Sequence, residues 1–233
     1  MILAELEVFH SRPYSPTRRV AIGRRELPCE PAPGFGPLLL GGIVAIGIDE
    51  LEPELQSDLY RLALQLDDGR RIPQPRLRHR FQADHIGLGR TKAMLVGEGD
   101  SFDFDFEGSG SAVQMALAAV YAAGQLPMSA RPRAFAIVRK AMRWRGAIDD
   151  ALISYLSGPD GAPSWSVSAF ADPVAWALGV FGFDPDTEVP ARREVQRTFR
   201  KQLRTAHPDH GGDTDEAGHR IAELAEARRI LLG

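Results

Sequence analysis

The chain contains a single cysteine, Cys29, among its 233 residues. One thiol cannot form an intramolecular disulfide, and it cannot supply the several ligands of a cysteine-rich zinc site. So little cysteine is typical of proteins in a reducing compartment. We therefore expect a cytoplasmic protein with no disulfide, no metal centre and no cofactor.

Long apolar runs are also missing. The longest one near the start covers residues 37–48, far short of the roughly 20 residues that span a bilayer. It also lies too far along the chain, and lacks the flanks, for a secretory signal peptide. We expect no membrane association.

Neither sign of charge dominates, since 28 Lys and Arg face 31 Asp and Glu for a formal net charge of −3. This balance gives no whole-chain attraction to nucleic acid or to an anionic membrane, so such affinity would need a local patch. The glycine-rich pieces at 34–36 and 41–42 lack the GxGxxG or Walker spacing. No nucleotide site is indicated.

The chain is long enough for one large or two modest domains. Residues 157–171 are rich in Gly, Pro and Ser, which is typical of a connection. We therefore predict a first domain over 1–156, a linker over 157–171 and a second domain over 172–233.

The first domain mixes strand and helix patterns, which predicts an α+β fold. Residues 102–106 alternate Phe with Asp, as in a strand with one buried face. The predicted strands are 2–9, 18–23, 92–96 and 102–106, the last two forming a hairpin. The predicted helices are 35–46, 53–66, 111–124, 131–145 and 148–156.

The second domain is expected to be all helical, with helices over 174–180, 192–206 and about 215–232. In the middle helix an apolar stripe comprises Val195, Phe199, Leu203 and Ala206. The last helix offers a second stripe of Ile221, Leu224, Ala225, Leu231 and Leu232. The two stripes predict antiparallel helices packed on each other, with the short first helix completing the core.

Five cations occupy the other face of the middle helix: Arg193, Arg197, Arg200, Lys201 and Arg204. Core packing does not require them, and like charges four residues apart repel. They form either a solvated face or a surface that attracts an acidic protein partner.

The tripeptide His207-Pro208-Asp209 follows this helix directly. Proline fixes its own φ and biases the residue before it toward an extended conformation, so the helix should end at or just before His207. Gly211 and Gly212 then allow a tight reversal into the last helix. The pattern predicts two helices whose connecting loop presents a rigid tripeptide.

This arrangement resembles the J domain of DnaJ-like co-chaperones. The matching segments are AWALGV at 175–180, VQRTFRK at 195–201, HPD at 207–209, GGD at 211–213 and IAELAEA at 221–227. The resemblance implies docking on the ATPase domain of a DnaK-type chaperone and stimulation of its ATP hydrolysis. It makes His207, Pro208 and Asp209 the functional loop and the five cations the docking face. The chain itself would then not be an enzyme.

The chain departs from that family at Gln202, a position that is commonly apolar, and at Ala206 and Ala225. It also has neither a cysteine-rich zinc region nor a Gly/Phe-rich linker. We therefore expect a dedicated adaptor, whose first domain selects an unknown client protein or a location.

Two basic segments offer an alternative of another class. Residues 70–92 include Arg76, Arg78 and Arg80 with histidines and Phe81 between cations, and 131–145 adds six cations and Trp144. They could make a nucleic-acid-binding or ribosome-associated protein. The competing interpretation is two solvated faces whose arginines pair with acids such as Asp103, Asp105 and Glu107.

A metal site is a further reading of the loop region. Its candidate ligands are His207, Asp209, His210, Asp213 and His219. Their spacing includes no pair of histidines four residues apart on one helix, so we do not expect one.

Overall fold

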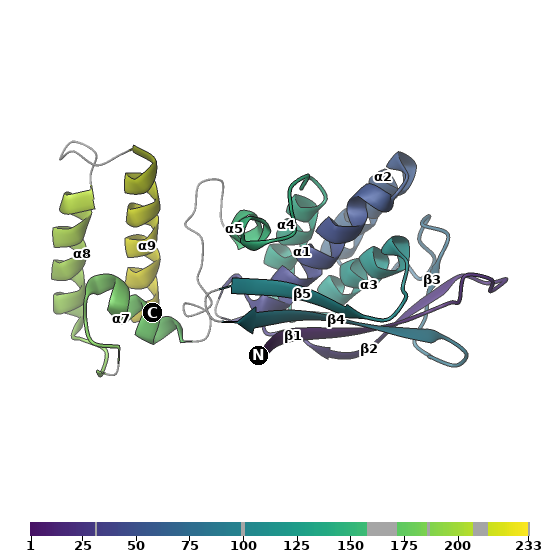
Figure 1. Ribbon diagram of the computed structural model, residues 1–233, viewed down its shortest axis with the longest axis horizontal. Coiled ribbons are helices and arrows are strands. Elements are labelled where there is room, and N and C mark those ends of the chain that lie inside the picture. Colours follow the sequence, from purple (N-terminus) through teal and green to yellow (C-terminus); the bar gives the residue numbers. More distant parts are fainter. Residues whose placement is uncertain (31, 99–100, 158–171, 186, 207–213, 233) are drawn as a thin grey trace. The chain divides into compact units, whose positions relative to one another are not determined.

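The computed structural model describes residues 1–30, 32–98, 101–157, 172–185, 187–206 and 214–232 (Figure 1). These residues form two compact units. The first comprises Met1–Glu98 and Phe102–Leu156, and the second is built mainly from Ser157–Gly233. No helix in the described ranges is both long and apolar enough to cross a membrane. Of the predicted linker 157–171, all but Ser157 lies outside the described residues.

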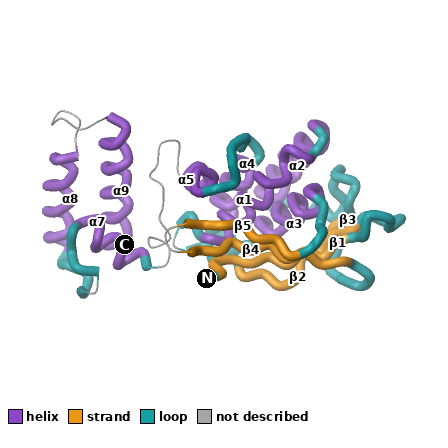
Figure 2. The backbone as a smooth tube through the Cα atoms, in the orientation of Figure 1, coloured by secondary structure: helices purple, strands orange, loops and turns teal. Residues whose placement is uncertain are grey.

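The first unit contains a five-stranded sheet, which establishes it as α+β (Figure 2). In sheet order the strands are β3 (Arg80–Phe81), β2 (Arg19–Glu26), β1 (Ile2–His10), β4 (Gly89–Glu98) and β5 (Ser101–Glu107). The central strand β1 pairs antiparallel with both neighbours, and Leu6 faces Arg25 on one side and Ala93 on the other. Because it is flanked on both sides, β1 is buried along most of its length.

Helices cover one face of this sheet (Figure 1). They are α1 (Phe35–Gly47), the short η1 (Ile48–Glu50), α2 (Pro53–Asp67), α3 (Ala112–Gly124), α4 (Arg131–Ala141) and α5 (Asp150–Ser157). Helix α1 packs against α3 and α4 and is buried on every side, which explains why it is apolar all round. At Gly42 a Cβ atom would lie 1.9 Å from the Phe104 ring of β5, so only glycine permits this contact.

The predicted strands and helices of the first unit are confirmed to within a few residues, apart from one helix end, but the short β3 and η1 were not predicted. The helix predicted over 131–145 ends at Ala141. The amides of Arg143 and Trp144 bond to carbonyls three residues back rather than four, so the chain tightens into turns before Gly146. The alternation in β5 is also confirmed, because Phe102 is buried while Asp103 and Asp105 are exposed.

The second unit contains the helices α7 (Pro173–Phe181), α8 (Arg192–Ala206) and α9 (Thr214–Leu232). Asp172 caps α7 by accepting a hydrogen bond from the amide of Ala175 at 2.9 Å, and Pro173 stands at the first position, where its missing N–H costs nothing. Helix α8 ends at Ala206, as the His-Pro pair that follows it predicts. Both α7 and α8 pack against α9.

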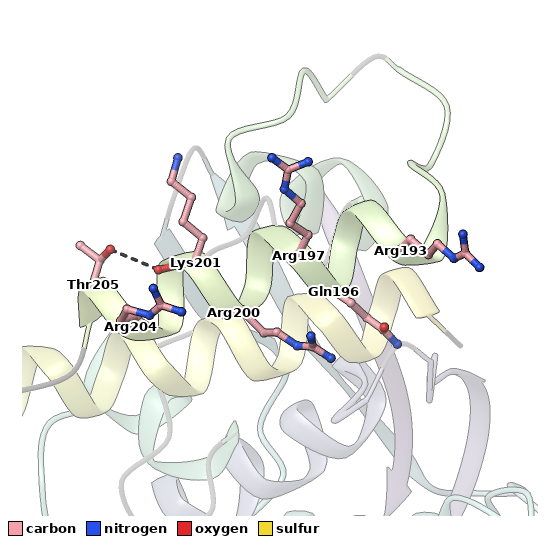
Figure 3. A pocket seen from close by; sticks show the side chains of 7 residues that line it. All are labelled: Arg193, Gln196, Arg197, Arg200, Lys201, Arg204 and Thr205. Atoms are coloured by element: carbon pink, nitrogen blue, oxygen red, sulfur yellow. Dashed lines mark hydrogen bonds between the residues drawn. The ribbon is translucent and has the colours of Figure 1, made fainter.

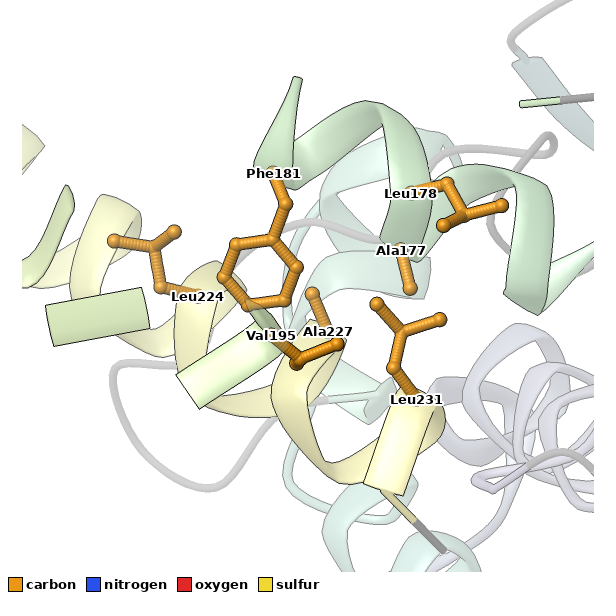
Figure 4. Close-up of a cluster of buried hydrophobic side chains, with 7 residues drawn as sticks. All are labelled: Ala177, Leu178, Phe181, Val195, Leu224, Ala227 and Leu231. Carbon is orange, nitrogen blue, oxygen red and sulfur yellow. The ribbon is translucent and has the colours of Figure 1, made fainter. Parts of the chain in front are cut away.

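A buried apolar cluster joins the three helices (Figure 4). It comprises Ala177, Leu178, Phe181, Val195, Leu224, Ala227 and Leu231. The apolar stripe predicted for α9 was wrong at Ala225, which is exposed, whereas Ala227 is fully buried. At 100° per residue Ala227 and Leu231 lie within about 60° of Leu224, while Ala225 is about 100° away.

A polar network closes the exposed end of this core. The amide of Gln202 on α8 donates to the carbonyl of Phe181 at 2.9 Å. Arg220 on α9 donates to the Gln202 side-chain oxygen at 3.1 Å and to the carbonyl of Val180 at 3.0 Å. The last carbonyls of a helix lack partners within it, so Gln202 and Arg220 supply them for α7.

Candidate docking site on helix α8

The five predicted cations lie along one exposed face of α8 (Figure 3). Arg193, Arg197, Arg200, Lys201 and Arg204 are all exposed. With Gln196 and Thr205 they line an open hollow of about 710 Å³. Among the residues that the structure describes, no carboxylate lies within 4.0 Å of any of the five.

The orientation of this face follows from the buried one. Val195 is 0% exposed within the cluster that joins α8 to α9. At 100° per residue the five cations lie roughly 140–240° around the helix from Val195. Packing of Val195 therefore turns every one of them away from the core. Phe199 and Leu203, from the same predicted stripe, are half-buried.

The charge on this face has an energetic cost. Positions 193/197, 197/201 and 200/204 each place two cations one turn apart, and each such pair costs about 0.2–0.5 kcal/mol. Three pairs give roughly 1 kcal/mol against folding. Glu194 is the one acid in this helix, so α8 holds a positive surface that its own residues do not neutralise.

The predicted functional loop lies outside the described residues. His207, Pro208 and Asp209 belong to the undescribed segment 207–213, between the end of α8 and the start of α9. The metal-site residues His210, Asp213 and the side chain of His219 also fall outside. Within the described part of the chain, no group of three or more His, Cys, Asp or Glu side chains is arranged to hold a metal ion.

The second predicted patch, Arg76, Arg78 and Arg80, is exposed on the loop that leads into β3 and on the first residue of that strand. Each of these arginines alternates with a buried neighbour: Pro75, Leu77 and His79. His79 Nδ1 lies 3.0 Å from the carbonyl of Leu77, which fixes the loop from inside. The three arginines therefore share the outer side of an anchored loop.

Other cations of the basic segments are engaged in ion pairs. Lys92 pairs with Glu5 at 2.8 Å and Arg90 with Glu7 at 3.0 Å on the open face of the sheet. In the later segment the pairs are Arg133–Glu30, Arg139–Asp67 and Arg145–Asp49. The acids suggested by the sequence, Asp103, Asp105 and Glu107, are not these partners. Sequence reasoning could not identify the partners because they come from distant elements.

Trp144 and the histidines of these segments have structural contacts. The Trp144 indole N–H donates to the carbonyl of Ala147 at 3.0 Å, and its ring centroid lies 4.9 Å from that of Tyr155. His85 stacks on Phe9 at 4.1 Å. Burial lowers the pKa of His79 below its ordinary value; the hydrogen bond to the Leu77 carbonyl opposes this lowering, and the nearby charge of Arg18 adds a smaller lowering.

Sequence reasoning missed three polar positions. Gln202 and Arg220 were not expected to cap α7. Arg25 on β2 was not grouped with the basic segments, although it lies in one groove with Arg70 and Arg131. No local sequence pattern could have placed Arg25 with Arg70 and Arg131, because the groove forms only when β2, the 69–73 turn and α4 meet.

Comparisons with protein-family models, with curated proteins and with solved structures give no match.

Proposed function

We propose that this protein is a DnaJ-like co-chaperone adaptor that docks on a DnaK-type chaperone and stimulates its ATP hydrolysis. The observation that carries the proposal is the exposed cationic face of α8, which ends at Ala206, directly before His207-Pro208-Asp209. The resemblance of these segments to the J domain supports the same conclusion. The cytoplasm is the proposed location.

The two parts of the site have different roles in this proposal. The cations attract an acidic surface of the partner, which raises the rate of encounter and sets the orientation. The tripeptide then makes the short-range contacts that alter the partner's ATPase. ATP chemistry belongs to the chaperone, so the chain contributes binding energy and no catalytic group.

The first unit would select the client or the location. It has its own sheet and helical layer, separate from the three-helix unit. An adaptor of this kind brings the chaperone to one place or one protein, and it needs no zinc-binding substrate region.

The test is steady-state ATP hydrolysis by a DnaK-type chaperone with the full chain added. We expect stimulation by the wild type, and loss of stimulation in His207→Gln and in Asp209→Asn. Arg197→Gln/Arg200→Gln should raise the half-maximal concentration by about tenfold, equivalent to about 1.4 kcal/mol, with a weaker salt dependence.

The matched control removes the same charge elsewhere. Arg61→Gln/Arg145→Gln changes two exposed arginines of the first unit, each in a surface ion pair, where pairs contribute about 0–1 kcal/mol. It should stimulate as the wild type does. Absence of stimulation by folded wild-type protein at saturation would refute the proposal.

A further inference from the structure

A second basic site lies in the first unit, at a groove of about 780 Å³. Its lining residues are Arg25, Leu66, Gly69, Arg70, Arg71, Ile72, Pro73, Phe81, Tyr121, Gly124, Gln125 and Arg131. Four of them are arginines and none is acidic. The two basic segments that the sequence singled out thus converge here, with Arg25 of β2 added.

The four arginines differ from the ion-paired arginines of this unit. In the described residues, none of the four has a carboxylate oxygen within 4.0 Å, whereas six other arginines of the unit do. Those six are Arg24, Arg61, Arg90, Arg133, Arg139 and Arg145. Arg25 instead donates to the side-chain oxygen of Gln125, and Arg131 to the carbonyl of Leu126 at 2.7 Å. Neutral partners orient these groups and leave their charge uncompensated.

Nearby negative charge does not cancel this excess. Of the acids next in sequence to lining residues, Glu26 pairs with Arg24 and Asp67 with Arg139, which leaves Asp68. Helices α2 and α3 end beside the groove, but each helix end carries only about −0.5 charge. Against four guanidinium groups, about two positive charges remain even when Asp68 and both helix ends are counted in full.

The floor of the groove is aromatic. The Phe81 ring stacks on Tyr121, with centroids 3.9 Å apart and planes 7° from parallel. Tyr121 is buried, and its hydroxyl donates to the carbonyl of Ile72. Phe81 is half-buried and lines the groove, so part of its ring is available to a flat ligand group.

The positive surface also continues beyond the groove. The amide of Phe81 donates to the carbonyl of Pro73 at 3.0 Å, so both ends of the intervening loop meet at the groove. That loop carries the exposed Arg76, Arg78 and Arg80. An extended polyanion would meet these cations next, whereas a single nucleotide would fill the groove alone.

We propose that this groove binds single-stranded nucleic acid, with phosphates at the arginines and a base stacked on Phe81. Guanidinium groups suit phosphate oxygens, and an aromatic ring stacks on any base without sequence preference. The site belongs to the first unit, so it does not rest on the co-chaperone proposal.

The experiment is fluorescence anisotropy of the full chain with labelled single-stranded oligonucleotides of about 12 nucleotides, titrated between about 50 mM and about 200 mM salt. Arg70→Gln/Arg71→Gln should weaken binding at least tenfold. Because each phosphate contact contributes about −0.7 to the slope of log affinity against log salt, that slope should fall by about 1.4. Phe81→Leu should weaken binding about tenfold while leaving the slope unchanged.

The control is Arg61→Gln/Arg145→Gln, which removes the same charge from the same unit outside the groove and should bind as the wild type does. Retention of full affinity by Arg70→Gln/Arg71→Gln would overturn the proposal, as would no binding by the wild type at low salt. Equal competition by an acidic peptide of matched charge would also overturn it and favour a protein ligand. Equal affinity for a mononucleotide would overturn the proposal that the ligand is an extended strand.

Discussion

The Gln202–Arg220 network gives the sharpest test of the second unit. Gln202 makes one half-buried bond to the Phe181 carbonyl and one exposed bond to Arg220. A net intramolecular hydrogen bond contributes about 0.5–1.5 kcal/mol. Gln202→Met keeps an unbranched side chain of similar length and good helix propensity, but it removes both bonds. We expect it to lower the free energy of unfolding by about 1–2 kcal/mol.

The two residues should also be coupled. Arg220→Met loses the bonds to Gln202 and to the Val180 carbonyl. Both single variants remove the Gln202–Arg220 hydrogen bond, whereas the double variant removes it only once. The losses of unfolding free energy in the two single variants should therefore sum to about 0.5–1 kcal/mol more than the loss in the double variant. In a unit of about 60 residues, each kcal/mol lowers the melting midpoint by about 4–8 °C.

The assay is urea denaturation of the full chain followed by tryptophan fluorescence. Replacing Trp144 and Trp165 by Phe leaves Trp176, which packs on the core of the second unit. Strict additivity of the two variants would show that the Gln202–Arg220 bond contributes nothing. A Gln202→Met variant more stable than the wild type would refute the capping argument.

Three further predictions concern packing and pH. Gly42→Ala should destabilise the first unit by about 1–3 kcal/mol in urea denaturation, because its methyl group would overlap the Phe104 ring. Gly179→Ala, in an exposed helix position with no atom within 4 Å of the new Cβ, should instead stabilise the second unit by about 0.5–1 kcal/mol. Burial lowers the pKa of His10 and His79 in the folded state, so the unfolded chain takes up their protons first as pH falls. Stability of the first unit should therefore decline below about pH 6.5, by at most about 1.4 kcal/mol per pH unit for each histidine. Urea midpoints compared at about pH 7.5 and about pH 5.5 test this, and His10→Gln/His79→Gln should flatten the profile.

Local pattern was sufficient for most secondary structure. The alternation around Phe102 and the burial of Val195, with Phe199 and Leu203 half-buried beside it, each depend on a single element, and the structure has both as expected. The end of α4 was wrong by four residues, because turns with short-range amide bonds can continue a helical pattern of residues. Ala225 was assigned to the core because a small apolar residue is compatible with either side of a helix.

Pairing between distant elements could not be predicted. The carboxylate partners of Arg133 and Arg139 are Glu30 and Asp67, about 100 and 72 positions away. The same holds for Arg25, which joins the groove only through the sheet. Sequence shows how much charge a segment has, but the fold decides which charges are neutralised.

The central place of β1 has a consequence for synthesis. Leu6 on β1 faces Ala93 on β4, so its second neighbour is made 87 residues later. At about 5–20 residues per second, translation takes roughly 4–17 s to cover that distance. Until β4 is made, β2 is the only strand paired with β1, and the backbone N–H and C=O groups along the other edge of β1 stay unpaired. An unpaired strand edge can pair with another chain, so the nascent chain should be prone to aggregation during the wait for β4.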